Sequence, residues 1–246
     1  MKEKIEEIAS YFSPNFYADL SNKLIQKDKI TIFDIGFFAG GFTKEIVENI
    51  RNLDTNKSIE IYSFDPIKNI KRDKINNFLK KNDVKWQHFD IAVGNKNSVE
   101  DFSVLKHFPA SGSSINNILE NSFWLKTRRY LLFPFTKASD FIQTLIVDQK
   151  KLDSLNIYID KLDLLKIDVE GYALPVLQGG IEIIKKHSPI IQLEILSKKK
   201  EFKNSENEIF KFMNNLKYEE TARKKHYTTH IFSDVVCVDY LFERRD

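Results

Sequence analysis

The sequence predicts an α/β fold: a doubly wound, mostly parallel sheet with helices on both faces. Short apolar runs typical of buried strands alternate along the chain with longer segments of helical periodicity. Two of the runs, 162–168 (LDLLKID) and 188–196 (SPIIQLEIL), are almost continuously apolar, as expected of parallel strands covered on both faces. No internal repeat and no linker rich in Pro, Gly or Ser interrupts the pattern, so we expect a helical segment over 1–28 followed by a single domain over 29–246.

The predicted elements follow one another in the order strand, helix, strand. The first strand, 29–35, precedes a helix that begins at Gly41, and the second strand, 58–66, ends on an Asp-Pro pair typical of a turn. Pro175 is expected in the first turn of its helix, where proline is tolerated. We also predict strands at 84–94, 98–105, 144–148, 162–168 and 188–196, helices at 67–82, 172–187 and 205–216, and a closing antiparallel pair at 218–225 and 234–242.

Composition limits the class of protein. The formal net charge is only +3, and acidic and basic residues are interleaved, which does not favour a nucleic-acid partner. The single cysteine, Cys237, allows neither an intrachain disulfide nor a cysteine-based zinc site. The charged first ten residues lack the apolar centre of a signal peptide, and no apolar run approaches the roughly 20 residues that span a bilayer. We therefore expect a soluble cytoplasmic protein without a membrane span.

The stretch 31–43 (TIFDIGFFAGGFT) ends a predicted strand on an acid and then turns through glycines into a helix. Glycine allows positive φ and a close approach of the backbone to a ligand, and the first turn of a helix presents N–H groups that favour an anion. Asp34 would attract a cation, so a ligand with both a carboxylate and an ammonium fits, as in the methionine end of S-adenosylmethionine. The alternative is a tight turn in which glycine serves geometry alone. The loop residues expected at the ligand are Asp34, Gly36, Phe38, Gly40 and Thr43.

The spacing of this loop argues against two other kinds of nucleotide site. The pattern D-x-G-x-x-x-G-G lacks the G-x-G of a dinucleotide fingerprint, and no Gly-Lys-Ser/Thr follows as in a phosphate loop. A nicotinamide cofactor is therefore the weaker alternative to S-adenosylmethionine.

The next two strands also end on acids. Asp65, with Pro66 beside it, is expected to accept hydrogen bonds from the ribose hydroxyls, although an Asp-Pro pair also starts turns for purely local reasons. Asp90 is expected at the adenine amino group, with Ile91 and Ala92 along the ring face, and the alternative is a plain strand end.

These motifs, taken in order, resemble the FkbM family of S-adenosylmethionine-dependent methyltransferases. The matching stretches are FDIGFFAGGFT, SFDP, DIAVG, LLKIDVEGYALPVLQGG and IIQLEI, and the likeness covers about 30–240. The resemblance implies the class I methyltransferase fold, which is Rossmann-like, with a seven-stranded sheet and an antiparallel last strand. It also implies O-methylation, with acceptors among sugars, glycan precursors or secondary metabolites. Phe37 and Phe38 depart from the Ala-Asn that is usual in the family, and Asp65 replaces the usual Glu.

Residues at the later strand ends are the candidates for chemistry. Methyl transfer requires an aligned acceptor oxygen and a group that takes its proton. Asp168, Glu170 and Glu194 lie at or near two strand ends, and Lys166 shares a strand face with Asp168 and needs a carboxylate partner. Three neighbouring carboxylates repel one another when all are ionised. The repulsion is relieved by a lysine among them, by a raised pKa that keeps one acid protonated, or by a divalent cation. Any such metal would lie at Asp168 and Glu194. Glu170 has the alternative of capping the following helix.

The segment at about 106–140 has no clear period and is rich in aromatic residues, proline and serine, which indicates an insertion over a site. We expect it to act as a lid that binds the acceptor. Its candidate residues are Ser113, Ser114, Trp124 and Arg128. The alternatives are that the serines cap a loop or helix, and that Trp124 and Arg128 only pack the insertion onto the core.

The leading hypothesis is thus an O-methyltransferase for a hydroxyl of a sugar, a glycan precursor or a related small molecule. A cofactor-binding partner subunit without turnover is the second hypothesis, because of Phe37 and Phe38, and a nicotinamide-dependent oxidoreductase is the third. A homo-oligomer is left open.

Overall fold

The structure is a computed structural model that describes residues 16–105, 142–198, 203–226 and 235–245. Its core is a seven-stranded sheet with the strand order β3-β2-β1-β7-β8-β10-β9. Every pairing from β3 to β8 is parallel, whereas β10 runs antiparallel to both of its neighbours. The predicted mostly parallel sheet with an antiparallel last strand is therefore confirmed. The strands are β1 (Lys29–Ile35), β2 (Ser58–Phe64), β3 (Val84–Phe89), β7 (Leu164–Ile167), β8 (Ile190–Lys198), β9 (Tyr218–His226) and β10 (Val235–Arg244).

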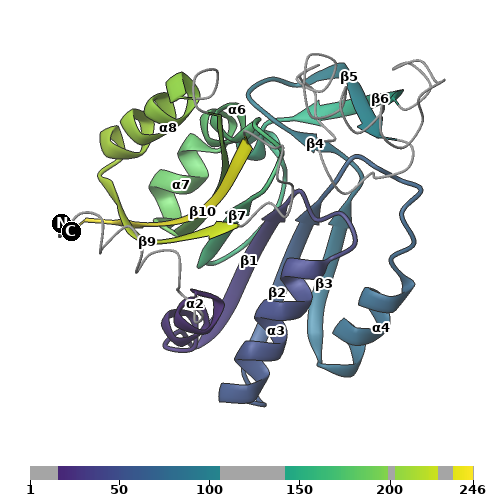
Figure 1. The fold of residues 1–246 in the computed structure, drawn as a ribbon. Coiled ribbons are helices and arrows are strands. Elements are labelled where there is room, and N and C mark those ends of the chain that lie inside the picture. Colours follow the sequence, from purple (N-terminus) through teal and green to yellow (C-terminus); the bar gives the residue numbers. More distant parts are fainter. Residues whose placement is uncertain (1–15, 106–141, 199–202, 227–234, 246) are drawn as a thin grey trace.

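Helices cover both faces of this sheet (Figure 1). One apolar cluster joins α2, α3 and α4 to one face, and a second joins α6, α7 and α8 to the other. Along β1 the side chains alternate: Ile30 and Ile32 pack with the first cluster, and Phe33 and Ile35 with the second. The helices are α2 (Phe16–Leu24), α3 (Gly41–Leu53), α4 (Asp73–Lys81), α6 (Ala173–Gly179), α7 (Ile181–His187) and α8 (Lys203–Asn215).

A second, three-stranded sheet lies over the carboxyl ends of β1, β2 and β3 (Figure 1). It consists of β4 (Ala92–Val93), β6 (Ile142–Lys150) and β5 (Ser98–Leu105), in that order. Ile67, which follows β2, packs into the apolar cluster beneath this sheet together with Ala92 and Val147. The loop after β2 thus becomes part of the contact between the two sheets.

Two predicted elements are divided in the structure. The strand expected over 84–94 ends at Phe89, and Ala92 and Val93 then join β6 of the second sheet. The helix expected over 172–187 is broken at Gly180, whose φ of −119° is not helical. A Cβ on Gly179 would lie 1.8 Å from the carbonyl oxygen of Gly94, so this glycine allows α6 to touch the chain that follows β4. Pro175 lies in the first turn of α6, as predicted.

Within the described ranges, no helix combines the length and the apolar character that crossing a membrane requires.

Candidate functional site

The candidate site lies where the strand order reverses, between β1 and β7. In parallel α/β sheets, ligands bind beyond the carboxyl ends of the strands at this point. The residues after β1, β2, β3 and β7, together with those near the end of β8, all belong to this edge of the sheet.

A buried ion pair between Lys166 and Asp34 forms the centre of this edge. The two residues are direct neighbours in the β1–β7 pairing, and their charged atoms lie 2.9 Å apart. The Lys166 side chain is 3% exposed and that of Asp34 is 0% exposed. Thr43, in the first turn of α3, donates a hydrogen bond of 2.7 Å to the second carboxylate oxygen of Asp34. The pair therefore ties β7, β1 and the start of α3 together.

Lys166 also reaches the loops on both sides of the switch point. Its Nζ donates a hydrogen bond of 2.9 Å to the carbonyl oxygen of Gly36 and lies 3.6 Å from Oδ2 of Asp168. Burial opposes its charge, but Asp34 and then Asp168 more than offset this, so the pKa of Lys166 is raised and the ammonium is retained. The expected carboxylate partner of Lys166 is confirmed, and Asp34 is its closest one.

This geometry gives Asp34 and Thr43 partners within the protein, whereas the sequence predicted them at a ligand. The sequence pattern left the Asp34 carboxylate to attract the ammonium of a ligand. In the structure Lys166 supplies that cation, and the Thr43 hydroxyl is directed to Asp34 rather than to a ligand. The strand register, which the sequence does not reveal, places Lys166 beside Asp34.

The glycine loop adopts the positive φ values that its sequence suggested. Gly36 and Gly40 both have φ of 79°, and Phe38 has φ of 48°. A Cβ on Gly36 would lie 1.7 Å from the carbonyl oxygen of Asp168, so glycine is required here by the close approach of the two loops. Gly40 immediately precedes α3, whose first residue is Gly41. The start of α3 thus belongs to the site edge, as predicted.

The two phenylalanines of this loop have different environments. Phe37 is buried and packs against Trp86 and His88, with ring centroids 5.6 and 5.5 Å apart. Phe37 therefore supports the loop from beneath. Phe38 is half-buried, and its backbone N–H donates a hydrogen bond of 2.9 Å to Oδ2 of Asp65.

Asp65 is buried and uses both carboxylate oxygens within the protein. Oδ2 accepts from the Phe38 N–H, and Oδ1 accepts from the N–H of Ile67 at 2.9 Å, two residues further along the chain. The second bond is an Asx turn across Pro66, so the alternative reading of Asp-Pro as a turn starter is correct. Burial raises the pKa of Asp65, while these two N–H groups act in the opposite direction. A ribose meets at most the remaining lone pairs of this carboxylate.

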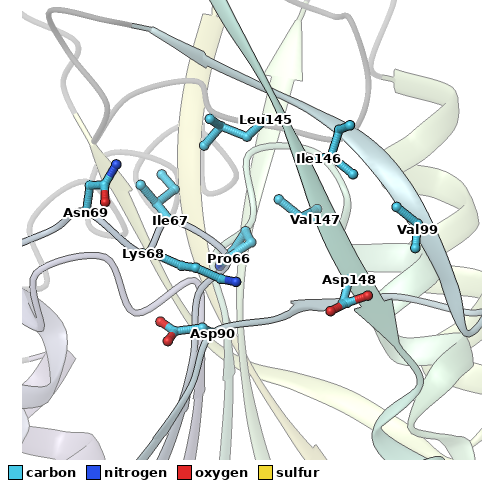
Figure 2. A pocket seen from close by; sticks show the side chains of 10 residues that line it. All are labelled: Pro66, Ile67, Lys68, Asn69, Asp90, Val99, Leu145, Ile146, Val147 and Asp148. Carbon is cyan, nitrogen blue, oxygen red and sulfur yellow. The ribbon is translucent and has the colours of Figure 1, made fainter.

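Asp90, in contrast, has an open carboxylate. Its side chain is 50% exposed and lies 3.6 Å from Nη1 of Arg72 and 3.3 Å from Nε2 of His88. Together with Pro66 and Ile67 it lines a cavity of about 400 Å³, whose opposite wall comes from Val147 and other residues of the second sheet (Figure 2). The cavity thus combines apolar walls with two accessible acids, Asp90 and Asp148, and with Lys68. Ile91 is half-buried against the main core, and Ala92, in β4 of the second sheet, is buried in its apolar cluster. Neither residue lines this cavity.

Ser63, His88 and Asp90 form an array that resembles a hydrolytic triad. The Ser63 Oγ lies 2.8 Å from Nδ1 of His88 and accepts a hydrogen bond from Trp86. However, Ser63 is fully buried, so no substrate can reach its hydroxyl. Burial, followed by Arg72, lowers the pKa of His88 to about 4, so the ring is neutral at pH 7 and serves to support Asp90.

The expected acids of β7 and β8 converge. Asp168 follows β7 and its side chain is 38% exposed, and Glu194, in β8, is half-buried. Burial and the nearby charges of Asp168 and Glu170 raise the pKa of Glu194 to about 9. Glu194 is therefore protonated at neutral pH, and its repulsion with Asp168 is relieved. Of the three predicted ways to relieve repulsion, the structure shows two: a lysine and a raised pKa.

Glu170 has φ of 49° and lies two residues before Tyr172, which holds the position before α6. Its charge still acts on Glu194.

A metal at these acids finds no support in the described ranges, where no three His, Cys, Asp or Glu side chains are grouped to hold an ion. The acceptor candidates Ser113, Ser114, Trp124 and Arg128 lie outside the described residues, as does the expected lid. No motif in the sequence indicated Arg72, because its partners Phe38, Ile67 and Asp90 come together only in the folded chain.

Replacing Lys166 by Met should lower the free energy of unfolding by roughly 3–5 kcal/mol, because Asp34 would be left as a buried, uncompensated charge. The double variant Lys166→Met/Asp34→Asn should lose less than the single variant. Urea denaturation of both proteins measures the difference. A double variant that is the less stable of the two would contradict the assignment of this pair.

Replacing Glu194 by Gln should remove a pH dependence of stability. The pKa of Glu194 is about 9 in the folded protein, above its ordinary value of 4.5. Between these two pH values the folded protein binds one proton more than the unfolded chain, so its stability falls as the pH rises from 4.5 to about 9. The glutamine of the variant cannot ionise. The melting temperatures of the variant and the wild type should therefore match near pH 5, and the variant should have the higher one near pH 9. The expected difference there in the free energy of unfolding is roughly 1–3 kcal/mol. Glu182→Gln, at a side chain that is 72% exposed, is the matched control. Equal pH profiles for Glu194→Gln and the wild type would contradict the assigned protonation.

Several solved structures are similar to this chain in fold. A protein from Listeria monocytogenes, provisionally assigned as a class I S-adenosylmethionine-dependent methyltransferase, has the same fold with a TM-score of 0.51, 11% identity, and coverage of 93% of this chain and 58% of that one. The methyltransferase FkbM of Methylobacillus flagellatus KT gives a TM-score of 0.47 and 13% identity, over 87% of this chain and 44% of that one. A provisionally assigned RNA methyltransferase from Pyrococcus horikoshii gives 0.46 and 11%, over 94% and 82%.

At these identities the solved structures show the fold alone, and this chain spans less than half the length of the Methylobacillus protein. No curated protein matches the sequence. The family model of the methyltransferase FkbM domain, however, matches residues 23–220, which is most of the chain. These residues include the glycine loop, Asp65, Asp90 and the acids after β7 and in β8. The chain therefore belongs to the FkbM family of methyltransferases.

Proposed function

We propose that this protein is an S-adenosylmethionine-dependent O-methyltransferase whose acceptor is a hydroxyl of a sugar, a glycan precursor or a related small molecule. Two observations support the proposal together. The chain belongs to a methyltransferase family. In addition, Lys166 holds the glycine loop and Asp168 together at the switch point of the sheet, where ligands bind in this fold. The acceptor class rests on the resemblance of the motifs and on the acids available to take a hydroxyl proton.

The residues present fit this cofactor in two parts. The cavity of about 400 Å³ beside Asp90 suits the adenosine half, because it offers apolar walls and an acid for the adenine amino group. The loop Gly36–Gly40 and the start of α3 suit the carboxylate of the methionine half. Asp34 is already paired with Lys166, so we do not assign it to the ammonium of the methionine half.

The same geometry suggests distinct roles for two acids in the reaction. The loop over 36–40 and the cavity beside Asp90 would hold the cofactor, which would supply a transferable methyl group on a sulfonium and leave as S-adenosylhomocysteine. Asp168, at the open end of β7, takes the proton that the hydroxyl loses. Glu194 keeps its own proton at neutral pH and donates a hydrogen bond that orients the acceptor.

The structure weakens the case for a partner subunit without turnover. That hypothesis rested on Phe37 and Phe38 beside the ligand, yet Phe37 packs into the core beneath the loop. A cytoplasmic location and a homo-oligomer stay predictions.

Isothermal titration of the full chain with S-adenosylmethionine and with S-adenosylhomocysteine should give saturable binding, with a Kd of roughly 1 μM to 1 mM, the usual range for enzyme substrates. NAD should give no heat, because the loop lacks the dinucleotide spacing. Folded protein that takes up neither sulfur compound at millimolar concentration would end the proposal, and NAD uptake would favour an oxidoreductase.

Asp168→Asn should lower the rate of methyl transfer by about 10²–10⁴-fold, the range for loss of a positioned base. Glu194→Gln, which mimics the protonated acid, should cost less than about tenfold at pH 7. Release of S-adenosylhomocysteine in the presence of a panel of monosaccharides and nucleotide sugars measures both rates. Full activity of Asp168→Asn would refute the assigned base.

A further inference from the structure

We propose that Arg72 is a positioning residue for the cofactor: it joins the three loops after β1, β2 and β3, so that the adenosine cavity is already formed before the cofactor binds. This inference rests on the proposed function and adds to it a residue that neither the motifs nor the family comparison assigns.

The contacts of Arg72 reach all three loops at once. Its Nε donates a hydrogen bond of 3.1 Å to the carbonyl oxygen of Phe38, in the glycine loop. Its Nη2 donates one of 2.9 Å to the carbonyl oxygen of Ile67, in the loop after β2. Its Nη1 lies 3.6 Å from Asp90, which follows β3, and Nη2 lies 3.6 Å from Asp65. One guanidinium therefore contacts each strand end that borders the proposed adenosine half.

Asp65 closes the network from the other side. Its two oxygens accept the N–H groups of Phe38 and Ile67, the same two residues whose carbonyl groups face Arg72. Each of these residues is thus held through both its N–H and its C=O. The left-handed backbone at Phe38, which costs energy in an isolated chain, is fixed by this arrangement.

The Arg72 guanidinium and its partners are buried, so the positive charge of Arg72 is needed to balance the Asp65 carboxylate. The Arg72 side chain is only 11% exposed, and the Asp65 carboxylate beside it is nearly inaccessible. Loss of the cation would leave this carboxylate and two carbonyl groups short of partners in a region with little water. The accessible acid, Asp90, would also lose its cationic neighbour and keep only the neutral His88 ring beside it.

An arginine is required because the three contacts diverge. The guanidinium presents five donors in a planar fork, whereas a lysine ammonium is a compact charge on a flexible stem. Lysine at this position would keep the charge near Asp65 but could not bond to Phe38 and Ile67 in the same way. The contacts of Arg72 do not extend to Asp168 or Glu194, so its effect should fall on the cofactor rather than on the acceptor.

Arg51 provides a matched control at the opposite end of the same strands. Its guanidinium also bonds to backbone carbonyl groups, those of Asn82 and Lys57, at 2.6 to 3.0 Å. It joins the end of α3 to the segments that enter β2 and β3. Arg51→Gln is therefore expected to lose stability through the same kind of backbone contact, whereas only Arg72→Gln disturbs the cavity.

The test is isothermal titration of the full chain, as wild type, Arg72→Gln, Arg72→Lys and Arg51→Gln, with S-adenosylhomocysteine and with 5′-methylthioadenosine, which retains the adenosine half. We expect Arg72→Gln to weaken the binding of both compounds by roughly 10–100-fold, a loss of the size of one or two charge-assisted hydrogen bonds. Arg72→Lys should fold and still bind at least about fivefold more weakly than the wild type, and Arg51→Gln should stay within about twofold. Thermal unfolding confirms that each variant is folded at the temperature of titration.

The outcomes separate the two proposals. If the wild type binds neither compound, the proposed function fails and this inference fails with it. If the wild type binds but both Arg72 variants bind equally well, Arg72 is only a structural residue, and the proposed function stands. Equal weakening by Arg51→Gln would likewise show that the effect is one of stability. If Arg72→Gln does not fold, the affinity of Arg72→Lys decides.

Discussion

The buried pair of Lys166 and Asp34 is the constraint on which the site edge depends. Two neighbouring parallel strands each place a charge on the same face, and neither charge is accessible to water. Such a pair is costly to break from one side, because the remaining charge would be stranded in a low dielectric. Since Lys166 also bonds to Gly36 and approaches Asp168, the pair fixes the separation of the two loops that flank the switch point. Protein charges thus shape the site before any ligand contributes its own.

The fold could be predicted from the sequence because it depends on local patterns. Apolar runs, helical periodicity and the glycine-hinged turn each carry their signal within about ten residues. The two divided elements show where prediction from local patterns fails. The chain leaves β3 after Phe89 to pair with β6, and the helix expected over 172–187 breaks at Gly180. Both events depend on contacts with distant segments, which no window of the sequence contains.

The site could be predicted only in part, for the same reason. The strand-end rule selected Asp90 and Asp168, which are accessible in the structure. The rule does not indicate which acids already have partners within the protein. The sequence therefore predicted Asp34 and Asp65 at a ligand, although Asp34 forms an ion pair with Lys166 and Asp65 accepts hydrogen bonds from two backbone N–H groups. Arg72 went unnoticed because its importance lies in the three loops that it joins, and those come together only in space.

The antiparallel pairing of β5 and β6 has a consequence for how this scaffold changes in evolution. Leu105 lies opposite Ile142, and the ladder continues to Ser98 and Gln149. The end of β5 and the start of β6 therefore lie at one point of the domain. Doubling the length of a chain that joins two such ends costs only about 0.6 kcal/mol of closure entropy. Insertions, deletions or wholesale exchange between the ends of this hairpin can thus diversify the molecule while the parallel strands beneath stay as they are.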